Sequence, residues 1–132
     1  MKNLFVIALS LFSLQVFAHD HHTKNYCSQA AQPVCAHLGY DGEITSEAAG
    51  EFVFHVVSAG ADRMKDLTID LWMDMGDGHG HGSAPVTITQ FGPGKYKVSD
   101  AWFVMPGQWL VRSTFTIDGV AHVIAIPLNI KQ

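Results

Sequence analysis

The sequence predicts an all-β protein, an immunoglobulin-like antiparallel β-sandwich of about six or seven strands that follows an irregular N-terminal arm. Apolar and polar residues alternate over most of the chain after residue 50, which is the period of a half-buried strand. Turn signals separate these stretches at intervals of about 8–12 residues, as in sandwiches. No stretch after residue 50 has a helical period.

The clearest pattern is a C-terminal hairpin. Alternating apolar residues run into Asp118-Gly119 and continue after it, and Asp-Gly favours a type I′ turn, in which both central residues have positive φ. A second hairpin, closing at residues 91–95, sets Ile88 opposite Val98. The C-terminal hairpin predicts four opposed pairs: Ile117 and Val120, Phe115 and His122, Val111 and Ile126, and Trp109 and Leu128.

The first eighteen residues predict a secretory signal peptide. Lys2 precedes an apolar run from Leu4 to Phe17, and Ala18 occupies the position before the expected cleavage. The run is short for a membrane span, although an uncleaved anchor is the alternative. We expect a periplasmic or secreted protein with no stable membrane span after cleavage. The expected organisation is a signal peptide (1–18), an irregular arm (19–49) and a β-sandwich domain (50–132).

The chain contains two cysteines, Cys27 and Cys35. Disulfides form in oxidising compartments, so a disulfide that tethers the arm is the expected state of an exported pair. The alternative is a Cu(I) or Zn(II) site made of the two thiolates and His37.

Composition and motifs exclude several functions. The formal net charge is −4 and there is no basic patch, so nucleic-acid binding is not expected. No Gly-x-Ser-x-Gly element, catalytic carboxylate pair or phosphate-binding glycine loop occurs, so we expect no enzyme. The chain is instead rich in metal-binding side chains, with eight histidines and five methionines.

A glycine-rich segment, residues 74–83, carries the first candidate metal site. Its glycines would let a loop bend two imidazoles towards one point, and thioether with imidazole suits copper, Cu(I) through Met and Cu(II) through His. Asp74 and Asp77 would favour Zn(II). The alternative is that this segment is a solvated loop that binds no metal, and that Met73 and Met75 are ordinary core residues facing inward. The candidate ligands are His79, His81, Met75 and Met73.

The expected mature N-terminus carries the second candidate site. Cleavage after Ala18 would leave His19 first and His21 third. The terminal amine, two backbone amides and the third-position imidazole would form a square-planar set for Cu(II) or Ni(II). The alternative is that these histidines belong to a solvated polar tail that binds no metal. If the arm folded onto the glycine-rich loop, the two candidate sites would form one site.

The remaining histidines and tryptophans have structural interpretations. His55 lies within a predicted strand, and His122 on an inward face, where a hydrogen bond would satisfy it. Trp102 and Trp109 are expected in the core. Trp72 lies on the opposite face from its apolar neighbours and would mark a partner surface if exposed.

Several short motifs, in order, resemble YtkA-like and FixH-like extracytoplasmic β-sandwich domains. The resemblance covers roughly residues 50–130 and leaves the cysteine-bearing arm without a counterpart. It implies copper handling and a link to cytochrome oxidase assembly. FixH-like proteins usually keep a membrane anchor, whereas the apolar segment here looks cleavable. The motifs are Met73-Asp74-Met75-Gly76, Pro85-Val86, Gly94-Lys95-Tyr96 and Val104-Met105-Pro106-Gly107-Gln108-Trp109.

The sequence therefore predicts a periplasmic protein that binds copper, with zinc or nickel as alternatives, and buffers or delivers it by ligand exchange. An envelope protein would act as metal donor or acceptor, and the chain would be a monomer or a weak dimer. The main alternative is a metal-free immunoglobulin-like interaction module of the cell envelope that docks through Trp72. A copper redox enzyme is a third interpretation, with little room for a substrate cleft.

Overall fold

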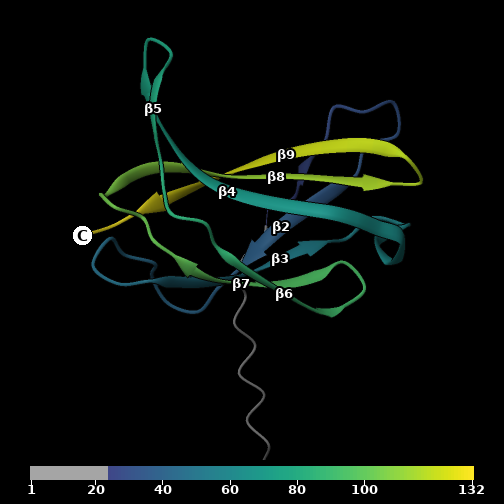
Figure 1. Ribbon diagram of the computed structural model, residues 1–132, viewed down its shortest axis with the longest axis horizontal. Coiled ribbons are helices and arrows are strands. Elements are labelled where there is room, and N and C mark those ends of the chain that lie inside the picture. The colour runs from purple at the N-terminus through teal and green to yellow at the C-terminus, as the bar shows by residue number, and fades with distance from the viewer. Residues whose placement is uncertain (1–23) are drawn as a thin grey trace, which may run out of the picture.

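The computed structural model describes residues 24–132, which form two facing antiparallel sheets (Figure 1). One sheet has the order β1-β2-β3-β7-β6, with β1 Tyr26–Cys27, β2 Cys35–Gly39, β3 Gly50–Val56, β7 Lys95–Ala101 and β6 Thr87–Gly92. The other has the order β5-β4-β8-β9, with β5 His79–Gly82, β4 Met64–Gly76, β8 Gly107–Ile117 and β9 Val120–Ile130. The predicted β-sandwich is confirmed, with nine strands instead of six or seven.

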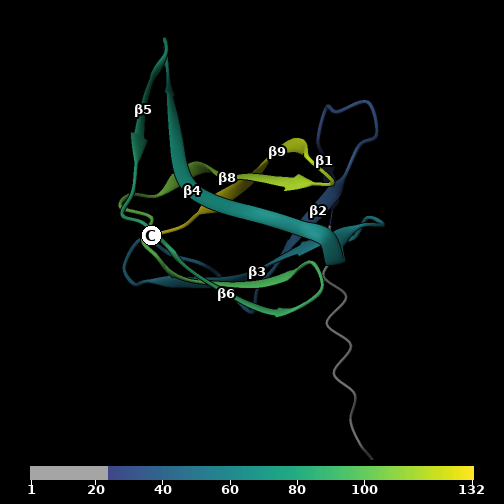
Figure 2. The same cartoon turned by 45° about the vertical axis from the view of Figure 1, so that its right-hand side comes forward.

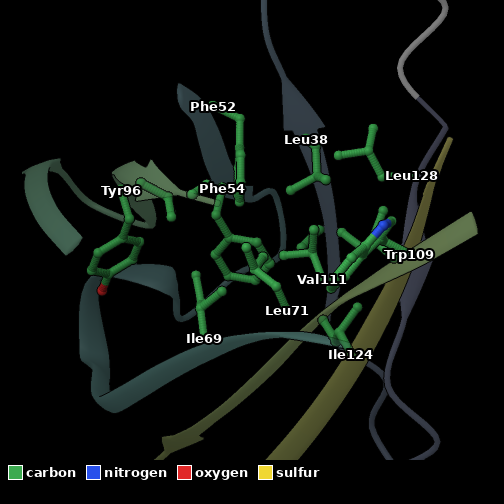
Figure 3. Close-up of a cluster of buried hydrophobic side chains, with 14 of the residues drawn as sticks. Leu38, Phe52, Phe54, Ile69, Leu71, Tyr96, Trp109, Val111, Ile124 and Leu128 are labelled. Carbon is green, nitrogen blue, oxygen red and sulfur yellow. The ribbon is translucent and has the colours of Figure 1, made fainter. Parts of the chain in front are cut away.

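The core lies between the two sheets and is made by the residues of each strand that point inward (Figure 3). Phe52 and Phe54 of β3 are fully buried, as is Trp109 of β8. Phe54 meets Phe115 edge to face, with ring centroids 6.4 Å apart. The expectation that Trp102 belongs to this core was wrong, because this residue is 46% exposed. A register shift beside Asp100, which has a φ of 55°, moves the alternation by one residue, so Ala101 and Phe103 face the core instead.

The two predicted hairpins are confirmed residue by residue. All four predicted pairs of β8 and β9 lie opposite each other, and Ile88 lies opposite Val98. Asp118 and Gly119 have φ of 49° and 79°, as a type I′ turn requires.

The N-terminal arm is more regular than the sequence predicts. Residues 26–39 contain β1 and β2, and β2 pairs with β3 inside the five-stranded sheet. Ala36 and Leu38 alternate inward and are buried, so five residues suffice to add a strand to an existing sheet. The sandwich therefore begins within the segment expected to be irregular. The predicted Cys27–Cys35 disulfide is present and joins β1 to β2 at directly opposite positions.

The hairpin of β4 and β5 extends beyond the body of the sandwich (Figures 1 and 2). β4 is thirteen residues long, and only its first part, from Met64 to Trp72, pairs with β8. Within the described part of the chain, the end of β4 pairs with β5 alone, and β5 is the edge strand of its sheet.

Within residues 24–132 no helix has the length and apolar character that a bilayer crossing requires. The expected signal peptide and the candidate ligands His19 and His21 lie outside the described residues.

Candidate metal site

The glycine-rich segment forms a β-hairpin, and the expectation of an open loop was wrong. Asp77 and Gly78 have φ of 53° and 75°, which is the type I′ geometry of a two-residue hairpin turn. Gly76 has φ of 85° and lies at a register shift after Asp74, as in a β-bulge. The glycines therefore serve the turn and the bulge, and the imidazoles that follow lie on a strand.

Gly80 has a separate packing role. A Cβ atom at this position would lie 2.2 Å from Cζ2 of Trp72, so the indole ring packs directly on the β5 backbone. On this face the Arg112 guanidinium lies 4.6 Å from the Trp72 ring centroid, and its Nε donates to Asp70 at 2.7 Å. Trp72 is therefore half-buried and is not the freely exposed partner residue that the interaction-module interpretation required.

The register of the hairpin decides which side chains share a face. Met73 lies directly opposite His81, and opposed residues of an antiparallel pair project to the same side. His79 is two residues before His81, and Met75 is two residues after Met73, so both belong to this side by strand alternation, with the bulge beside Met75. The backbone thus places all four predicted ligands on one face of the hairpin.

The four side chains differ in exposure. Met73 is 9% exposed, and its Cε lies 2.5 Å from where a Cβ of Gly107 would stand. Met75 is 57% exposed, contrary to the expected inward position, because β4 has by then left the sandwich. His79 and His81 are exposed. The face therefore runs from a buried thioether to three side chains that solvent reaches.

The two aspartates of the hairpin do not add to this face. Asp74 lies between Met73 and Met75, and its Oδ1 accepts a hydrogen bond from the backbone N–H of Gly76 at 2.9 Å. Asp77 is in the turn. In residues 24–132 no three His, Cys, Asp or Glu side chains gather as a ligand group. A metal bound here would therefore depend on the methionines.

Met105 is a third thioether at this end of the sandwich that the ligand prediction missed. It precedes Gly107, the residue that Met73 approaches, and its backbone carbonyl accepts a hydrogen bond from Nε1 of Trp109 at 2.9 Å. This bond closes the Met-Pro-Gly turn. The Met-Pro-Gly-x-Trp motif was the available signal, but the approach of β4 to this turn was not predictable from it.

The core histidine behaves as expected. His122 is 4% exposed, its Nδ1 forms a hydrogen bond with Ser28 Oγ at 2.9 Å, and its ring stacks on Phe115. This hydrogen bond ties the segment after β1 to β9.

Comparison with known proteins places the chain in a family. A family model described as YtkA-like matches residues 28–114. The match begins within the N-terminal arm, includes β2, and ends within β8. No curated protein and no solved structure matches the chain.

Proposed function

Because this chain belongs to the YtkA-like family, we propose that it works outside the cytoplasm as a copper-binding protein that buffers or delivers the metal. The proposed ligands are His79, His81, Met75 and Met73. The proposal is supported by one observation above all, the register that sets Met73 opposite His81 on a projecting hairpin.

The chemistry of this face favours copper over harder ions. Thioether sulfur is a soft ligand that selects Cu(I), whereas imidazole accepts both Cu(I) and Cu(II). A face with both types can hold copper in either oxidation state. The Asp74 carboxylate, which would favour zinc, hydrogen-bonds the bulge at Gly76 instead.

The position of the hairpin suits transfer by ligand exchange. Among residues 24–132 no strand pairs with the outer side of β5, which is an edge strand, and edge strands accept partners readily. An incoming acceptor can displace the exposed imidazoles first and the buried Met73 thioether last. No bond-making step is required of the protein, so the proposed role is not enzymatic.

Two further parts of the proposal, a role in oxidase assembly and a second metal-binding set, do not depend on the geometry of the hairpin. A role in cytochrome oxidase assembly follows from the resemblance to the YtkA-like and FixH-like domains. His19 and His21 would form a second copper or nickel set, or complete the first, after cleavage of the expected signal peptide.

A metal-free interaction module remains the second candidate, and one observation favours it. Trp102 and Val104 are 46% and 57% exposed, and Ser83, just after β5, donates a hydrogen bond from Oγ to the backbone carbonyl of Trp102. An apolar patch therefore adjoins the base of the hairpin and would be the docking surface in place of Trp72.

The experiment that separates the two candidates is a Cu(I) titration in competition with a chromogenic chelator. The double variant His79→Ala/His81→Ala should lose most of the Cu(I) affinity of the chain. Asp77→Asn is the matched control in the same hairpin, because asparagine tolerates the positive φ of the turn, and it should bind as the unaltered chain does. Equal affinity in the double variant and the control would reject the hairpin site.

A further inference from the structure

A second pair of imidazoles meets on the opposite sheet, away from the β4–β5 hairpin. His37 of β2 lies directly opposite His55 of β3, and their ring centroids are 4.9 Å apart. We propose that His37 and His55 form a two-histidine site for a borderline divalent cation, such as Zn(II) or Cu(II), on the outer face of the five-stranded sheet. This site is independent of the copper proposal for the hairpin.

The strand alternation places both rings on the outer face. His37 stands between the buried residues Ala36 and Leu38, and His55 between the buried residues Phe54 and Val56. Both histidines are half-buried, so the rings are held by their neighbours while solvent still reaches them. A cation can therefore approach this pair from outside without disturbing the core.

The ring separation fits one shared ion. With a metal–nitrogen bond of about 2.0–2.1 Å, the centre of a coordinating imidazole lies about 3.2 Å from the metal, the remainder being the ring radius. Two centroids 4.9 Å apart then subtend about 100° at the ion, between square-planar and tetrahedral values. Rotation about the Cβ–Cγ bond of His55 turns its ring nitrogens towards His37 and leaves the ring centroid in place, while the His37 ring keeps its orientation.

Asn25 prepares one of the two ligands. Nδ1–H of His37 donates to Oδ1 of Asn25 at 3.2 Å, so Nε2 keeps its lone pair for a metal. Such a partner on the far nitrogen is typical of metal-binding histidines. The Cys27–Cys35 disulfide holds β1 beside β2, two residues from both Asn25 and His37.

The local electrostatics keep the imidazoles in the form that binds metals. Burial lowers the pKa of His37. Burial, then the neighbouring His37 and Lys95, lowers the pKa of His55. Neutral rings are required for coordination. Lys95 of β7 lies opposite His55. Its positive charge repels a bound cation and therefore weakens metal binding at this site.

The test is a titration of the full mature chain with Zn(II), followed through the imidazole ¹⁵N NMR signals. The Nε2 signals of His37 and His55 should shift together along one binding curve. His55→Gln should weaken Zn(II) binding at His37 by about tenfold or more, and Asn25→Ala should weaken it measurably. Lys95→Gln should strengthen it a few-fold, because it removes a like charge.

The double variant His79→Ala/His81→Ala is the matched control, and it should leave the Zn(II) response of His37 and His55 unchanged. This control separates the present site from the hairpin. Signals of His37 and His55 that stay constant while Zn(II) saturates other groups would overturn the proposal. So would an unchanged Zn(II) response of His37 in His55→Gln, since the two rings would then not share an ion.

Discussion

Replacement of Gly80 by alanine tests the packing that shapes the candidate copper face. The new Cβ would lie 2.2 Å from Cζ2 and 2.4 Å from Cε2 of Trp72. Carbon atoms pack at about 3.5–4.0 Å, so the indole ring must move by roughly 1.5 Å. That movement separates the ring from the guanidinium of Arg112, which now lies 4.6 Å from its centroid.

The expected cost follows from three contributions. Overpacking typically costs about 1–3 kcal/mol, and the lost cation–π contact contributes about 0.5–1 kcal/mol of this. Alanine in place of glycine offsets about 0.4–1 kcal/mol by restricting the unfolded chain. The net destabilisation is about 1–2 kcal/mol, and it should be local, because β4 is the one strand of residues 24–132 that pairs with β5.

Amide hydrogen exchange of the β5 backbone is the assay, with Gly82→Ala as the matched control. A Cβ at Gly82 would lie 4.0 Å from the nearest Trp72 atoms, an ordinary contact, so this variant should retain or increase protection. Gly80→Ala should exchange about 5- to 30-fold faster, the equivalent of 1–2 kcal/mol, and should also bind Cu(I) more weakly without losing a ligand. Equal protection in the two variants would refute the packing argument.

Three other perturbations have defined outcomes. Replacing both Cys27 and Cys35 by serine should lower the free energy of unfolding by about 2–3 kcal/mol in denaturant titrations, because the bond fixes β1 to its sheet. Ser28→Ala should cost about 1–3 kcal/mol by calorimetry, because it leaves Nδ1 of the buried His122 without its partner, whereas Ser28→Thr should cost less. Burial lowers the pKa of His55 from its ordinary 6.5, so the unfolded state binds more protons just below that pH and stability should fall as the pH drops through 6.5. His55→Gln should flatten this slope in thermal melts recorded across that range, and an unchanged slope would contradict the assignment.

The C-terminal half of the fold was predictable because local signals determine it. The Asp118-Gly119 turn fixes the register of its two strands, and every predicted pair of that hairpin is present. The alternation of apolar residues then predicts which face is buried. Neither inference needs knowledge of distant parts of the chain.

The N-terminal strands were not predictable in the same way. β2 is five residues long and includes Cys35, His37 and Gly39, which are weak strand signals. It forms because β3 offers a hydrogen-bonding edge and the core accepts Ala36 and Leu38. The meeting of His37 with His55 depends on this non-local register, so local sequence patterns do not reveal the histidine pair.

The four residues of the candidate copper face were predicted from the sequence, but the hairpin that holds them was not. The glycines around His79 and His81 suggested a loop, whereas the hairpin depends on the packing of Trp72 over Gly80. That contact joins side chain and backbone across two strands, and periodicity does not reveal it. The exposure of Met75 likewise follows from the length of β4 beyond the sandwich.

X-ray absorption spectroscopy of the chain without its expected signal peptide, loaded with one equivalent of Cu(I), tests the copper proposal most directly, because it identifies the ligand atoms. The hairpin face predicts both thioether sulfur and imidazole nitrogen around the ion. It also predicts that Met73→Leu/Met75→Leu removes the sulfur contribution and His79→Ala/His81→Ala the imidazole contribution. A spectrum with nitrogen and oxygen ligands alone, or one that neither variant alters, would contradict the account.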